Sequence, residues 1–143
     1  KVNLKLITDG DVSGALLVTE EKFNVDIFLG IGGGPEGVLA ASALDTHNCH
    51  FQGRFIFDRD EDIKTAKKIG ISDLNKKYEL NEIVKGDSIF CATAITDCMP
   101  NNSIKGVIKK SKSSFFTETI FTHKSADNKG VIKKEIIFDD TKK

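Results

Sequence analysis

The pattern of apolar and polar residues in the first third of the chain predicts alternating strands and helices. Val2 to Thr8 alternates as a strand does, and Phe23 to Leu29 is continuous enough in apolar character for a buried parallel strand. Val12 to Thr19 and the Ala-rich run from Gly37 to Leu44 have helical spacing. The order strand, helix, strand, helix predicts a β-α-β unit with a right-handed crossover.

The middle of the chain predicts shorter elements separated by turn residues. Phe51 to Phe57 has the composition of a strand, and Asp60 begins a helix through Ile69 that carries its acids first and its lysines last. Gly70 is the expected C-terminal cap of that helix. Leu74 to Lys85 predicts one or two short helices, and Ser88 to Ile95 predicts a buried strand.

Two β-branched and aromatic runs near the C-terminus, Phe115 to His123 and Val131 to Phe138, predict a β-hairpin. The fold class expected from all these elements is α/β: a layered mixed sheet flanked by helices and ending in the hairpin. A length of 143 residues fits one domain over 1–143. Because Lys1 to Thr8 has no initiator Met and begins like a strand already in progress, we expect a portion of a longer chain.

Composition narrows the range of partners. The 21 Lys and Arg residues balance 21 Asp and Glu residues, so the bulk charge does not favour a nucleic-acid partner. No apolar run approaches the roughly 18 residues of a membrane span. Three cysteines without a C-x-x-C spacing favour a reducing compartment. We therefore expect a soluble, cytoplasmic protein with no nucleic-acid and no membrane partner.

The glycine-rich segment 30–37 supports two interpretations. Gly32, Gly34 and Gly37 form a G-x-G-x-x-G pattern, and Asp58 follows about 20 residues later, as a dinucleotide-binding module requires. However, a pyrophosphate would bind the amides of the first helical turn, where Pro35 lacks a donor and Glu36 is negative.

A carboxylate at this place suits a phosphate that arrives with a divalent metal ion. Glu36 would then be an oxygen ligand of Mg²⁺ or Mn²⁺, while the glycine amides face phosphoryl or sugar oxygens. The alternative is that Glu36 only stabilises the start of a helix, where acids are common.

A second acidic group comes directly after the first predicted strand. Asp9, Gly10 and Asp11 would lie at the ligand-binding edge of an α/β sheet, where the carboxylates would bind sugar hydroxyls or a metal. Alternatively, Asp9 or Asp11 caps the next helix and Gly10 makes a turn.

A weaker metal candidate is the group His47, Cys49 and His50. Its side chains can all bind metals, but zinc sites usually draw ligands from two separated elements.

The segment Gly30-Ile-Gly-Gly-Gly-Pro-Glu-Gly-Val-Leu-Ala-Ala41 closely resembles the signature of class II (GlpX-type) fructose-1,6-bisphosphatases. The resemblance runs from residue 1 to the terminal hairpin, with further segments in the same order. These segments are Asp9-Gly-Asp-Val12, Phe51-Gln-Gly-Arg54, Ile69-Gly-Ile-Ser-Asp-Leu-Asn75, Gly86-Asp87 and Ala92-Thr-Ala-Ile-Thr-Asp97.

The resemblance implies a metal-dependent phosphatase of the lithium-sensitive phosphatase fold. It would hydrolyse the 1-phosphate of fructose 1,6-bisphosphate with Mn²⁺ or Mg²⁺ to give fructose 6-phosphate. By motif, Glu36 matches a catalytic metal ligand, and Asp9, Gly10, Asp11 and Gly33 match substrate-binding positions. Asp97 receives no role, because the family usually has a glycine after it where this chain has Cys98.

The resemblance also implies that the remaining metal carboxylates belong to the N-terminal half of the parent. This chain is therefore expected to be inactive alone, with that N-terminal half as a partner and with a homo-oligomeric assembly. A transit peptide on that half would direct the protein to an organelle. The alternatives are the dinucleotide-binding module and a non-catalytic dimerisation or regulatory domain.

Overall fold

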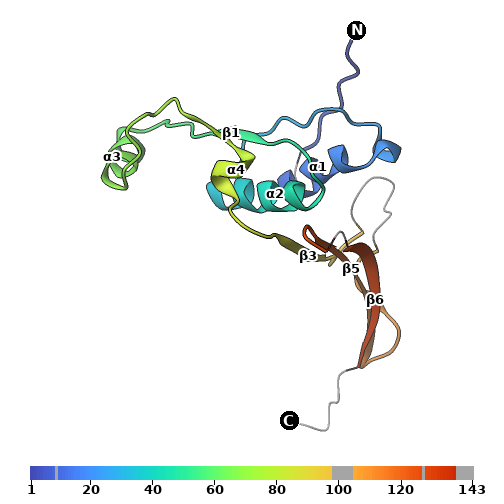
Figure 1. Ribbon diagram of the computed structural model, residues 1–143. Helices are drawn as coiled ribbons and strands as arrows, with labels where there is room; N and C mark the ends of the chain where they lie inside the picture. Colours follow the sequence, from blue (N-terminus) through green and yellow to red (C-terminus); the bar gives the residue numbers. More distant parts are fainter. Residues whose placement is uncertain (9, 98–104, 127, 138–143) are drawn as a thin grey trace, which may run out of the picture.

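The structure is a computed structural model that describes residues 1–8, 10–97, 105–126 and 128–137. Helix α2, Gly34–Thr46, lies at the centre of the molecule, with α1, Asp11–Ala15, beside it and α3, Asp60–Lys68, at the end of an extended arm (Figure 1). A sheet that contains strands β3, Ile89–Thr93, β5, Ser114–His123, and β6, Asn128–Ile137, lies against one end of this helical part and extends away from it.

Among the described helices, α2 and α3 are the longest, and the others are short turns of helix. Helix α1 covers Asp11–Ala15 and continues into the 3₁₀ turn η1 at Leu16–Thr19, which is followed by η2 at Glu21–Phe23. Helix α2 covers Gly34–Thr46. Helix α3 covers Asp60–Lys68, and the single turn α4 covers Leu80–Ile83.

The described strands form two antiparallel sheets. In the smaller sheet β1, Gln52–Arg54, pairs with β2, Lys77–Glu79. In the larger sheet the central strand is β5, Ser114–His123, which pairs along one edge with β3, Ile89–Thr93, and with β4, Ile108–Lys109.

The predicted hairpin is confirmed. Strand β6, Asn128–Ile137, pairs with β5 from Ser114↔Ile137 to His123↔Asn128. It occupies the opposite edge of β5, because residues 119–123 of β5 already pair with β3. The hairpin therefore forms the outer part of a four-stranded sheet.

Several helices are also confirmed. The predicted helix at 60–69 is α3, in which Ile69 is the C-cap and Gly70 has a φ of +94° that glycine adopts readily. The predicted helix at 12–19 is α1 with η1. Helix α2 begins three residues before the predicted Gly37 and ends two residues after Leu44.

The predicted parallel β-α-β unit is wrong. Neither 2–8 nor 23–29 is a strand, and every strand pairing among the described residues is antiparallel. Alternation makes a segment suitable for a sheet, but a strand exists only where a neighbour accepts its backbone hydrogen bonds. Val2 and Leu29 are 89% and 88% exposed, so their apolar side chains have no sheet to pack on among the described residues.

Smaller corrections concern the middle of the chain. The strand expected over 51–57 is limited to the three residues of β1. The segment 74–85, predicted as helices, begins with the strand β2 before the turn α4. The strand at 88–95 is β3, but alternate residues such as Ile89 are exposed, so only one of its faces is buried.

The core lies where α1, α2 and β3 meet. Ala15, Ala40 and Leu44 form one buried cluster between α1 and α2. Ala43 packs with Leu16 and Phe90 in a second cluster that joins the helices to β3. Small alanine side chains on α2 let the neighbouring backbones approach closely. The buried residues of α2 begin at Ala40 and end at Asp45.

The fold is therefore mixed α/β, with helices and antiparallel sheets. No helix among the described residues has the length and apolar character needed to cross a membrane.

Candidate functional site

The glycine-rich segment ends at the start of α2 in the manner that the sequence predicts. Gly33 is the N-cap, with an extended backbone at φ −68° and ψ 154°, and its carbonyl accepts a hydrogen bond from Gly37 N at 3.0 Å. Pro35 and Glu36 lie in the first turn. The missing N–H of Pro35 costs nothing there, and the positive end of the helix dipole favours the Glu36 carboxylate.

Glu36 turns back toward its own N-cap. A Cβ atom built on Gly33 would overlap Glu36 Oε2, so the carboxylate lies directly against this glycine. An acid at this third helical position takes the same direction in a capping box, which explains locally why the side chain folds back. The side chain remains exposed.

Asp11 reaches the same segment from α1. A Cβ atom built on Gly32 would overlap Asp11 Oδ2, so the Asp11 carboxylate lies against the residue before Gly33. Asp11 does not cap α1. The N-cap is Gly10, with φ +88°, and its carbonyl accepts a hydrogen bond from Ser13 Oγ at 2.9 Å.

The structure thus gathers most of the predicted site. Asp11 and Glu36 flank the consecutive glycines 32 and 33, and Gly10 lies at the start of the helix that carries Asp11. Asp9 lies outside the described residues, so its predicted role stays a prediction.

A close approach at Gly14 positions the glycine-rich segment on α1. A Cβ atom at Gly14 would lie 2.6 Å from Phe28 Cε2 and 2.7 Å from Ile7 Cδ1. Only glycine leaves room for both side chains at this point of the helix. Because Phe28 comes just before the segment 30–34, this contact brings that segment to the helix that carries Asp11.

The two carboxylates are suitable ligands for a hard cation. Mg²⁺ is commonly held by one or two protein carboxylates together with phosphate oxygens, so the Glu36 carboxylate is a ligand of the right kind, and the Asp11 carboxylate lies against the neighbouring glycine. Among the residues that the structure describes, no group of three or more His, Cys, Asp or Glu side chains is arranged to hold a metal.

His47, Cys49 and His50 do not form the metal site considered from the sequence. Cys49 packs against the cluster between α1 and α2, and its thiol lies 3.7 Å from the carbonyl of His47. Burial raises the pKa of the Cys49 thiol, which disfavours the thiolate that binds metals. His47 is the C-cap of α2, whereas His50 is exposed.

The dinucleotide interpretation lacks its structural context. No strand precedes Gly32 in the described structure, and no parallel neighbour brings a second strand beside it. The first turn of α2 presents Pro35 and a carboxylate instead of amides alone, and Asp58 is exposed just before α3.

Asp97, which received no role from the sequence, joins two parts of the backbone. Its carboxylate accepts hydrogen bonds from Gly106 N at 2.9 Å and from Lys105 Nζ at 2.9 Å. The hydrogen bond from the Gly106 amide has the largest effect on the pKa of Asp97, followed by the bond from Lys105, and both lower it. A Cβ atom at Gly106 would lie 2.5 Å from the backbone of Thr96, so the close approach requires a glycine.

Sequence reasoning missed a polar junction between α2 and the larger sheet. Asp45, near the end of α2, is 3% exposed and accepts hydrogen bonds from Ser88 Oγ at 2.6 Å and from Lys124 Nζ at 2.5 Å. Next to it, Thr46 Oγ1 lies 2.6 Å from Thr122 Oγ1. An acid among alanines on a helix is the only hint in the sequence, because the partners lie far along the chain.

The charge of Asp45 is maintained by its partners. Burial disfavours the carboxylate, but the hydrogen bonds from Lys124 and Ser88, helped by the Lys124 charge, outweigh it and lower the pKa of Asp45.

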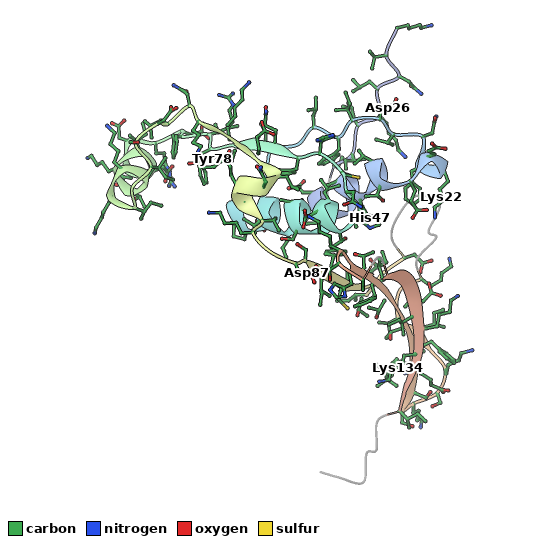
Figure 2. All side chains as sticks on the ribbon, in the orientation of Figure 1. Lys22, Asp26, His47, Tyr78, Asp87 and Lys134 are labelled. Carbon is green, nitrogen blue, oxygen red and sulfur yellow. The ribbon has the colours of Figure 1, made fainter. Side chains whose placement is uncertain are left out.

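A second missed cluster lies at the neighbouring end of the sheet, around Asp87, which precedes β3 by two residues (Figure 2). Asp87 Oδ2 lies 2.6 Å from Ser125 Oγ and 2.6 Å from His123 Nε2, and Ser125 N donates to Asp87 Oδ1 at 3.0 Å. The hydrogen bond from Ser125 Oγ and then the contact with His123 lower the pKa of Asp87 to about 2.

This low pKa predicts an acid-sensitive contribution to stability. Since the Asp87 pKa falls from 3.8 to about 2 on folding, its stabilisation is present above pH 3.8 and is lost as the pH falls through about 2. Asp87→Asn should therefore be less stable than wild type near neutral pH, and the difference should shrink as the pH falls from about 4 to about 2. Urea unfolding at several pH values measures this. The control Asp26→Asn changes an exposed carboxylate far from the sheet and should show no such trend.

Comparison with known proteins identifies the family of the chain. Residues 1–135 match the family described as bacterial fructose-1,6-bisphosphatase, glpX-encoded. The chain belongs to this family, whose curated members are class II fructose-1,6-bisphosphatase/sedoheptulose-1,7-bisphosphatase phosphatases of carbohydrate metabolism. The resemblance inferred from the glycine-rich segment is therefore confirmed.

Curated relatives carry the name D-fructose 1,6-bisphosphatase class 2/sedoheptulose 1,7-bisphosphatase. The protein from Thermosynechococcus vestitus is 36% identical over 118 residues, which cover 73% of this chain and 33% of that protein. One from Acaryochloris marina is 38% identical over 115 residues, covering 71% and 32%. The chain thus spans about a third of the length of the curated relatives it matches.

Proposed function

We propose that this chain is the C-terminal portion of a class II fructose-1,6-bisphosphatase. The parent enzyme would hydrolyse the 1-phosphate of fructose 1,6-bisphosphate to fructose 6-phosphate and phosphate, a step of gluconeogenesis. The observation that carries the proposal is that Asp11 lies against Gly32 and Glu36 against the next residue, Gly33, within a chain that belongs to this family. The relatives' name adds sedoheptulose 1,7-bisphosphate as a second substrate with a phosphate at the same carbon.

Glu36 would be a metal ligand, and Asp9, Gly10, Asp11 and Gly33 would bind the substrate. A bound Mn²⁺ or Mg²⁺ supplies positive charge to the phosphoryl oxygens and acidifies water. Asp11 accepts hydrogen bonds from sugar hydroxyls and so orients the ketose. Gly33 has no side chain, so its backbone can approach the phosphate while the Glu36 carboxylate is held beside it.

Charge explains why these groups act together. Two carboxylates beside the glycines would repel a phosphate that came without a cation, so phosphate and metal would bind as a unit. Catalysis of this type depends on positioning and fixed charge more than on covalent participation by the protein.

The apolar surface supports a longer parent chain as the working enzyme. Val2, Leu4, Leu6, Ile27, Leu29 and Ile31 are each more than 70% exposed. So many large apolar side chains exposed along the two segments 2–6 and 27–31 favour segments that another part of a longer chain covers. The rest of the parent would cover them and supply the remaining metal carboxylates.

The proposal is tested by phosphate release from fructose 1,6-bisphosphate with Mn²⁺, measured for the full-length parent and for this chain side by side. We expect an active parent and an inactive chain. An inactive parent would favour the non-catalytic dimerisation or regulatory domain, and an active chain would show that no essential ligand lies elsewhere. The predicted homo-oligomer stays a prediction that light scattering on the parent can test.

A further inference from the structure

The buried residues of helix α2 are concentrated at its C-terminal end. Its residues from Gly34 to Leu39 are exposed or half-buried, and its buried residues begin at Ala40 and end at Asp45. Glu36 therefore lies on the part of the helix with few contacts. The orientation of that part depends on how the other end is fixed.

The C-terminal end of α2 is held by side-chain hydrogen bonds. Asp45 accepts from Ser88 at the start of β3 and from Lys124 just after β5. Lys124 is itself fixed, because its backbone N–H donates to the Ser88 carbonyl at 3.0 Å. Thr46 and Thr122 add a contact one residue further along the helix.

Apolar contacts between alanines and leucines allow small rotations, whereas hydrogen bonds fix both distance and direction. Glu36 lies nine residues before Asp45, roughly 13 Å along the axis at 1.5 Å per residue. A tilt of about 5° at Asp45 would thus move Glu36 by about 1 Å. A displacement of that size can cost about 100-fold in rate.

We propose that Asp45, held by Lys124 and Ser88, is a positioning residue that orients α2 and thereby places Glu36 and Gly33 for catalysis. Asp45 touches neither substrate nor cation and acts through the helix. The inference rests on the proposed function for its catalytic consequence, but the orientation of α2 can be measured without activity.

The test uses Asp45→Asn in the full-length parent. Asn keeps the shape and can keep the hydrogen bond with Ser88, but it loses the ion pair with Lys124, whose half-exposed ammonium can still contact water. We expect faster amide hydrogen exchange over residues 37–40, and about tenfold weaker binding of Mn²⁺ in calorimetry with MnCl₂. Lys124→Arg, made with Asp45 intact, keeps the charge and should give values close to those of wild type.

The matched control is Asp87→Asn. Asp87 is the neighbour of Ser88 and has its own partners in His123 and Ser125, so the substitution also weakens this end of the sheet without removing a contact of α2. If Asp45→Asn fails to fold, Ser88→Ala removes the hydrogen bond from Ser88 Oγ to Asp45 and leaves the ion pair with Lys124 in place.

The outcomes are distinct. Faster exchange over 37–40 in Asp45→Asn or Ser88→Ala, and not in Asp87→Asn, supports the positioning role. If Asp45→Asn shows the same amide hydrogen exchange over 37–40 and the same Mn²⁺ affinity as Asp87→Asn, the positioning role of Asp45 is overturned. A wild-type parent that releases no phosphate would contradict the proposed function, while the exchange comparison would still decide the positioning of α2.

Discussion

Replacing Glu36 by Gln in the full-length parent should lower metal-dependent phosphate release about a thousandfold. A metal ion contributes several kcal/mol of charge stabilisation in the transition state, and each 1.36 kcal/mol corresponds to a factor of ten. Gln has the size of Glu but offers a hard cation only a neutral carbonyl oxygen in place of a charged carboxylate, so it binds the cation more weakly. The measurement is kcat at saturating substrate over a range of Mn²⁺ concentrations.

A matched control is available on α3. Glu61 is an exposed acid in the first turn of that helix, as Glu36 is in the first turn of α2. Glu61→Gln should leave phosphate release unchanged. Normal turnover by Glu36→Gln would mean that Glu36 only stabilises the start of its helix.

Gly33→Ala should lower kcat/KM about 100-fold while leaving the free energy of unfolding almost unchanged. The backbone of Gly33 is extended, so alanine fits without strain, but the new methyl group would occupy the place of the Glu36 carboxylate. That carboxylate ends a flexible side chain and can move aside. The variant should therefore still fold, but its Glu36 carboxylate should be displaced.

The neighbouring glycine provides the comparison. A Cβ atom at Gly34 meets no atom within 4 Å, so Gly34→Ala should keep its activity. Steady-state kinetics and urea unfolding on both variants measure the two effects separately. Equal activity of the two variants would contradict the contact between Gly33 and Glu36 as a functional one.

Helices and strands that are specified by residues within a single segment could be predicted from the sequence. Helix α3 has its acids, its lysines and Gly70 within a single segment, and the two hairpin strands are rich in β-branched and aromatic residues and are close neighbours in the sequence. The segments 2–8 and 23–29 also have strand-like sequences, yet strand formation depends on a neighbour that no local pattern reveals.

The same distinction applies to the site. Asp11, Gly33 and Glu36 could be found because they accompany short motifs at the starts of helices. The partners of Asp45 could not be found, since Ser88 and Lys124 lie 43 and 79 residues further along the chain. Long-range polar contacts leave almost no trace in a single sequence.

The contact between Asp45 and Lys124 has a consequence for biosynthesis. A ribosome makes Glu36 and Asp45 first, and Lys124 follows only after 79 more residues have been added. Local structure such as helix α2 can form early, but contacts between distant residues must await the later segment. A nascent chain that ends before β5 therefore contains the residues of the site without the anchor of its helix, and the site becomes ordered late in translation.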